Sequence, residues 1–295
     1  MKGKKELFFY ISVGAGLAFG TSSFMLLANL FGVVPGVWVC LGIVLAGLVC
    51  MVIAGSVAEL ASRYPSSPGI RTYLKVALGD KVSLFLVHAY LIFIVLIAGA
   101  ESYVFALVFK AVFPEASLYL IVLVVLAIII LVNLLGMELP KWFQMLTAYL
   151  LIAIIIVLGI MGVINKPAGS TFAFQFDMGE NMNNLINLPA AIALGIFLYI
   201  GFEWVTPLGF RPASYRKKIP NSMLIAILLN MIAYVCFSLG MPVQLNKVDP
   251  QNAIPQLGYF VNLFGKGGAY FALILSFFAA FSTFNAGIMG ASKLV

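Results

Sequence analysis

Charged residues are scarce in this chain. Only 9% of its 295 residues are Asp, Glu, Lys or Arg, whereas 63% are hydrophobic. Soluble globular domains carry about 25% charged residues, so the composition excludes an ordinary soluble domain and indicates a polytopic membrane protein. Apolar runs of about 20 residues recur along the chain, which favours an all-α protein with spanning helices over the alternating strands of a barrel.

Histidine and cysteine are also rare, with one and three residues respectively. So few of these residues cannot build the usual zinc site, and neither a phosphate-binding G-x-x-x-x-G-K-[ST] loop nor a pair of catalytic carboxylates is present. No metal site, no cofactor and no enzymatic activity are therefore expected. Cys40, Cys50 and Cys236 all fall inside apolar runs, so no disulfide framework is expected either.

The apolar runs predict eight membrane spans. The first run is too long for a secretory signal peptide and lacks a small-residue cleavage pattern after it, so it is expected to remain as a span. The expected spans are residues 7–31, 36–59, 83–112, 117–136, 142–164, 187–209, 221–243 and 268–290.

The basic residues predict the orientation. With a cytoplasmic N-terminus, thirteen of the 17 Lys and Arg residues lie on the cytoplasmic side. Positive residues concentrate on that side of bilayers, so we expect an integral protein of the plasma (inner) membrane. The net charge of +7 is then a topology signal within membrane lipid, and no nucleic acid partner is expected. The four cations left outside are Lys110, Lys166, Lys247 and Lys266.

The first expected span is interrupted by glycines. Gly14, Gly16 and Gly20 precede the polar triplet Thr21–Ser23. Small and hydroxylated residues allow a helix to unwind in mid-membrane, where its exposed amides and carbonyls face a ligand. The alternative is close helix packing, because Gly16 and Gly20 are four residues apart.

The sixth expected span supplies a second candidate break. It contains Gly201 and Glu203 and is followed by Pro207. Glycine weakens a helix by about 1 kcal/mol, and a charge at mid-membrane costs at least about 2.5 kcal/mol. Such residues in one span indicate a site, and they favour the broken-helix interpretation of the first span as well.

Glu101 lies deep in the third expected span, after the small residues 98–100. Its carboxylate is expected to point into the bundle, as a functional acid or as a hydrogen-bonded structural one. His88, thirteen residues earlier, falls on roughly the opposite face, so it is not expected to share the site. Glu59 is expected to be an interfacial or ion-paired carboxylate, and Gln144 an interfacial polar residue.

Three ordered motifs resemble those of the amino acid–polyamine–organocation permeases. Residues 13–24, VGAGLAFGTSSF, are similar to the first span of that family, whose broken centre usually reads G-[ST]-G. Residues 59–79 resemble its first cytoplasmic loop. Residues 201–203 together with 216–220, RKKIP, resemble its sixth span and the following loop.

The resemblance implies a fold of two inverted five-helix repeats, with the first and sixth spans broken around a midplane site. Residues 1–164 would form the first repeat and 187–295 part of the second, in one permease domain over 1–295. Phe197 matches an aromatic residue over the substrate. Glu203 matches the carboxylate that braces the sixth-span break.

The resemblance also assigns the substrate contacts. Backbone amides around Gly20, Thr21, Ser22 and Ser23 would bind a substrate carboxylate, and carbonyls beside Gly20 and Gly201 would take its amino group. Helix N-termini favour anions and unwound carbonyls favour cations, which agrees with this assignment.

Two departures from the family pattern bear on the site. Ser22 replaces the second glycine of the first-span motif, which changes the space or the hydrogen bonding where backbone approaches a ligand. The fifth span lacks the lysine of many proton-coupled relatives, whereas Ser282 and Thr283 match hydroxyls of sodium-coupled ones. The coupling ion, H⁺ or Na⁺, or an exchanged substrate, stays open.

The ten spans of the family also exceed the eight expected here, so the chain looks cut short.

The sequence predicts secondary-active transport of amino acids or related amines by alternating access. A carboxylate at Glu101 gives a lean toward cationic substrates. The alternative is a truncated, nontransporting amino-acid sensor or scaffold with the same fold. The exact substrate, the direction of transport and the oligomeric state stay open.

Overall fold

The computed structural model describes residues 2–34, 36–134, 141–165, 182–209, 214–245 and 252–291, and every regular element in these ranges is helical. The α-helices are α1 (Lys2–Ala18), α2 (Thr21–Val33), α3 (Trp38–Arg63), α4 (Ile70–Leu78), α5 (Asp80–Val112), α6 (Leu118–Leu134), α7 (Lys141–Ile164), α8 (Met182–Ile196), α9 (Ile219–Gln244), α10 (Gln256–Phe264) and α11 (Gly267–Ala291). Three short elements of other helical type are η1 (Phe197–Tyr199), η2 (Phe202–Leu208) and η3 (Ser214–Lys218).

The helices agree with most of the expected spans. Six helical stretches of the described residues are long and apolar enough to cross a bilayer, and the bent pair of α1 and α2 makes up to seven. The fourth expected span corresponds to α6, a shorter apolar helix whose following residues, 135–140, lie outside the described ranges. Two short helices lie in connections between expected spans, α4 after the second span and α10 before the last.

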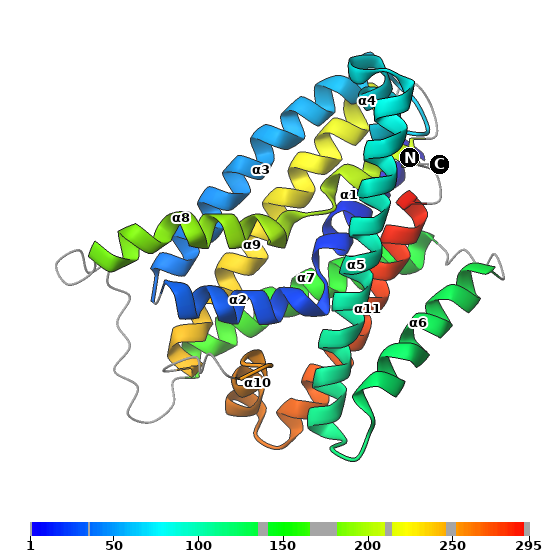
Figure 1. The fold of residues 1–295 in the computed structure, drawn as a ribbon. Helices are drawn as coiled ribbons and strands as arrows, with labels where there is room; N and C mark the ends of the chain where they lie inside the picture. Colours follow the sequence, from blue (N-terminus) through cyan, green and yellow to red (C-terminus); the bar gives the residue numbers. More distant parts are fainter. Residues whose placement is uncertain are drawn as a thin grey trace.

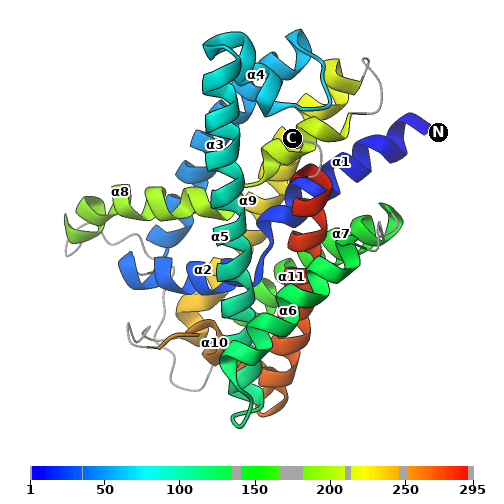
Figure 2. The same ribbon diagram turned by 45° about the vertical axis from the view of Figure 1, so that its right-hand side comes forward.

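The halves of the two broken spans lie together. Both α2 and α8 run across the bundle, at a steep angle to the long helix α5, and they contact each other (Figure 1). The same arrangement is visible after a 45° turn (Figure 2). The short helices α4 and α10 lie at opposite ends of the molecule (Figure 1).

Helix α9 forms the centre of the bundle and packs against α7, α3 and α1. Its contact with α7 depends on glycine, because a Cβ on Gly159 would lie only 2.6 Å from the backbone nitrogen of Phe237. Apolar burial does not drive helix association inside a bilayer, so close backbone approach and hydrogen bonds must do so. Gln244 adds such bonds by donating to the carbonyls of Gly162 at 2.9 Å and Asn165 at 2.7 Å.

Gly159→Ala is therefore expected to lower the free energy of unfolding by about 1–3 kcal/mol through overpacking. Gly55→Ala is the matched control, because no heavy atom lies within 4 Å of a Cβ built at Gly55 in α3. That control should be neutral or stabilise by roughly 0.5–1 kcal/mol. Equilibrium unfolding of both variants in the same detergent checks this, and equal effects would contradict the α7–α9 contact.

Candidate functional site

The first span is broken at Gly20. Helix α1 ends at Ala18, α2 begins at Thr21, and the two are bent by 57°. Gly20 is the N-cap residue of α2, in an extended conformation with φ −81° and ψ 170°. Any residue can adopt this conformation, and glycine offers no side chain to accept from the first amides of α2. The cap must therefore come from elsewhere.

Glu101 of α5 provides that cap. Its Oε2 accepts from the backbone N–H of Ser22 at 3.1 Å, and its Oε1 accepts from the Ser22 hydroxyl. Glu101 is only 4% exposed. The carboxylate lies directly over Gly20, since a Cβ there would be 2.6 Å from the Glu101 Cδ. Glycine is thus required at position 20 by the space that Glu101 occupies, and not by backbone strain.

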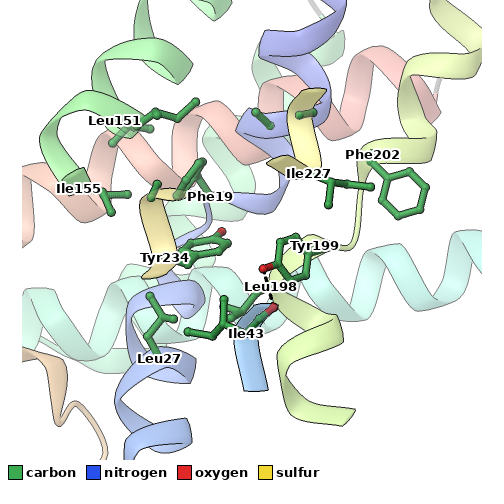
Figure 3. Packing of buried hydrophobic residues seen from close by; sticks show 14 of the residues in the cluster. Phe19, Leu27, Ile43, Leu151, Ile155, Leu198, Tyr199, Phe202, Ile227 and Tyr234 are labelled. Atoms are coloured by element: carbon green, nitrogen blue, oxygen red, sulfur yellow. Dashed lines mark hydrogen bonds between the residues drawn. The ribbon is translucent and has the colours of Figure 1, made fainter. Parts of the chain in front are cut away.

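Carbonyl groups at the end of α1 accept hydrogen bonds from side chains. The Ala18 oxygen accepts from the Ser23 hydroxyl and from the Tyr234 phenol, both at 2.7 Å. Asn230 donates to the Ala15 oxygen at 3.4 Å. Figure 3 shows Tyr234 beside Phe19 in the buried cluster at this break. These bonds hold the broken end of α1 against α9.

The sixth span is broken at Gly201. Its backbone has φ +118°, a left-handed conformation that side chains with a Cβ rarely adopt. The short elements η1 and η2 lie on either side, so the span loses regular α-helix over residues 197–208. A Cβ at Gly201 would also lie 2.7 Å from the Leu17 Cγ. The first and sixth spans therefore touch at their breaks.

Glu203 lies against the second break. Its Oε2 accepts from the Gly201 N–H at 3.1 Å, and its Oε1 accepts from the Tyr90 phenol of α5. The Tyr90 ring stacks on Trp204, with ring centroids 5.4 Å apart. Glu203 thus bonds to unwound backbone at the break, and the bracing role that the resemblance implies stays a prediction.

Hydroxyl residues of α11 bond at the end of α1. Thr283 donates to the carbonyls of Gly16 at 3.2 Å and Leu17 at 3.3 Å. Ser282 accepts from the Gln144 amide at 3.2 Å. Gln144, expected to be interfacial, is fully buried between α1, α7 and α11. Its burial shows that it faces the bundle and does not decide its depth in the bilayer, so the interfacial placement stays a prediction.

The remaining candidate residues have different surroundings. Thr21 donates to the Ser276 carbonyl of α11 at 2.9 Å. Phe197 in η1 is 55% exposed and does not belong to the buried cluster around the breaks. His88 is exposed and bonds within its own helix, to the Leu84 carbonyl at 2.7 Å. Glu59 pairs with Arg63 at 2.5 Å, as expected.

A cavity of about 420 Å³ lies beside the second break, between α3, α4 and residues 196–203. Its walls include Ile53, Tyr73, Ile200 and Phe202, and Glu203 is its charged residue. Glu101 does not line it. The two carboxylates thus face different surroundings.

Neither Glu101 nor Glu203 has a cationic partner among the described residues. The ion pairs there join Glu59 to Arg63, Lys75 to Asp80 and Glu6 to Lys218. A buried carboxylate in a bilayer is costly unless a proton or a cation compensates its charge. Both sites are therefore suited to a cationic or proton-bearing group.

Sequence reasoning singled out both carboxylates but missed other side chains that bond at the breaks. Tyr90 bonds to Glu203, and Asn230 and Tyr234 bond to carbonyls of α1, yet each lies within a long apolar run. Their one common signal is a hydrogen-bonding side chain in mid-span, which by itself does not identify a partner.

Comparison with known proteins places the chain in a family. The family model described as "Amino acid permease" matches residues 10–295. The Uncharacterized amino acid permease YvbW of Bacillus subtilis (strain 168) is 24% identical over 96% of this chain and 64% of its own length.

Two further relatives are similar at the same level. The L-methionine/branched-chain amino acid exporter YjeH of Escherichia coli (strain K12) is 25% identical over 81% of this chain and 56% of its own length. The human Cystine/glutamate transporter is 22% identical over 96% of this chain and 57% of its own length. The chain therefore spans between 56% and 64% of the length of these relatives.

A double-mutant cycle tests the contact between Gly20 and Glu101. In the unmodified protein, Gly20→Ala should destabilise by about 1–3 kcal/mol, because the new methyl overlaps the carboxylate. In a Glu101→Ala background the same change should be nearly neutral, which gives a coupling energy of roughly 0.5–3 kcal/mol. Unfolding free energies of the four proteins provide the measurement.

Gly201→Ala is the control for this cycle. An added methyl there is strained by the φ of +118° and by overlap with Leu17. The loss of unfolding free energy should therefore be the same in the unmodified protein and in the Glu101→Ala background. A Gly20→Ala effect that does not depend on residue 101 would show that the carboxylate does not occupy this place.

Proposed function

Because the chain belongs to the amino acid permease family, we propose that it carries out secondary-active transport of amino acids or related amines by alternating access. The protein is an integral membrane protein. In this proposal it lies in the plasma (inner) membrane with a cytoplasmic N-terminus, and it is a transporter rather than an enzyme. The observation that carries the proposal is the contact between two broken spans, each with a buried carboxylate at its break that forms no ion pair with any described residue.

Broken helices in contact offer what a transport site needs. Helix ends present unpaired amides and carbonyls to a solute, while the rest of each helix keeps its backbone bonds satisfied in lipid. Gly20, Thr21, Ser22, Ser23, Glu101, Phe197 and Gly201 are the proposed substrate-binding residues. Glu203 is the proposed brace of the sixth-span break.

The lean toward cationic substrates rests on Glu101. One relative is named for methionine and branched-chain amino acids and another for cystine and glutamate, and these names describe the substrates of those proteins only. Glu101 is a buried carboxylate with no ion pair among the described residues, so a cationic group on the substrate would compensate the charge of its ionised form.

A coupling ion has a proposed place beside α1. The hydroxyls of Ser282 and Thr283 lie at α1 with the carbonyls of Gly16 and Leu17. Oxygen atoms of hydroxyls and unwound helices are the ligands that transporters use for small cations. The Gln144 amide, which donates to Ser282, is neutral. It therefore does not supply a fixed positive charge there, as a lysine would.

The cytoplasmic end has a proposed gate contact. Lys218 of η3 pairs with Glu6 of α1, and both side chains are largely buried, with 29% and 23% exposed. The pair joins the start of the first span to the segment after the sixth. Opening toward the cytoplasm would separate these two segments and break the pair.

Uptake into proteoliposomes tests the transport proposal. Labelled lysine, arginine, leucine and short amines should enter in a saturable, gradient-dependent manner. Glu101→Gln should reduce uptake of cationic substrates about tenfold or more, because a charge-assisted hydrogen bond contributes roughly 1.5–3 kcal/mol. Unchanged preference between cationic and neutral substrates would refute the cationic lean. Ligand-induced stabilisation without any uptake would favour a sensor or scaffold.

Charge exchange tests the gate contact. Glu6→Lys and Lys218→Glu should each destabilise the protein by about 1 kcal/mol, because like charges then meet in a largely buried place. The double exchange should recover most of that loss and also the uptake rate of the unmodified protein. If the double variant shows the sum of the two single losses, Glu6 and Lys218 do not act as a pair.

A further inference from the structure

The N-terminus of α2 is an anion site that the protein fills itself. Helix N-termini attract anions through unpaired amides and the helix dipole. Here the anion is the Glu101 carboxylate, bonded to both the amide and the hydroxyl of Ser22. Glu101 is only 4% exposed, and its carboxylate lies against Gly20.

A second carboxylate does not fit beside the first. The space over Gly20 is taken up by Glu101, as the overlap of a single added methyl shows. Two buried like charges in contact also repel each other strongly, because the low dielectric of the interior screens them little. A ligand with its own carboxylate would have to displace Glu101, whereas a ligand without one meets a preformed, negatively charged group.

The hydrogen-bond acceptor positions of Glu101 that Ser22 does not use suit an ammonium group. An ionised carboxylate offers about four acceptor positions, and Ser22 occupies two of them. An ammonium donates up to three hydrogen bonds and carries the compensating positive charge. No Lys or Arg of the described residues forms an ion pair with Glu101, so the protein leaves this position to another cation.

We propose that Glu101 takes the place of a substrate carboxylate at the first break, so that this permease carries amines without an α-carboxylate in preference to the parent amino acids. The inference rests on the proposed transport function and specifies its substrate class. Ser22 is then a specificity residue, because its hydroxyl helps to hold Glu101 on the helix end where glycine would offer only an amide.

Matched ligand pairs test the inference. Lysine and cadaverine, arginine and agmatine, and leucine and isoamylamine differ only by the carboxylate. Binding to the intact protein in detergent is measured by ligand-induced stabilisation and by competition. In the unmodified protein each amine should bind about tenfold or more tightly than its amino acid, because like-charge contact weakens the latter.

Variants at Glu101 identify the source of the preference. Glu101→Ala frees the Ser22 amide for an external carboxylate, so amino acids should gain affinity relative to their amines. Glu101→Gln keeps the size of the side chain and removes its charge, and it should reduce amine binding even if Glu101→Ala does not fold. Glu59→Ala, an exposed carboxylate far along α3, is the control and should leave the ratio unchanged.

Three results would overturn the inference. Amino acids that bind as tightly as their amines to the unmodified protein would show that the substrate displaces Glu101, and the transport proposal would stand. An amine preference that persists in Glu101→Ala and Glu101→Gln would assign it to another residue. Absence of both binding and uptake for all six compounds would remove the transport proposal itself.

Discussion

The hydrogen bonds between Glu101 and Ser22 determine how the first span can break inside a membrane. A helix end in lipid must find partners for its open amides, since no water is available. Gly20 provides no capping side chain, so a carboxylate from α5 takes that place. The break, the need for glycine at position 20 and the burial of a charge are therefore one arrangement. Each part requires the other two.

The two breaks solve the same problem in different ways. At Gly201 the carboxylate comes from Glu203, two residues along the same span, and Tyr90 of α5 fixes its other oxygen. At Gly20 it comes from a separate helix. Both braces involve α5, through Tyr90 at the second break and through Glu101 itself at the first, so both broken spans are coupled to the third span.

Much of this arrangement could be predicted from the sequence, because glycine, charge and hydropathy are local signals. Both breaks and the inward direction of Glu101 followed from them. The identity of the group on the α2 amides did not, because it depends on the packing of α5 against α2.

The most direct test of this account is an experimental structure of the protein with bound cadaverine, compared with one with bound lysine. The account predicts that Glu101 stays on the Ser22 amide and that an ammonium nitrogen of cadaverine lies about 3 Å from the carboxylate. A lysine carboxylate on the Ser22 amide, with Glu101 turned away from α2, would contradict it.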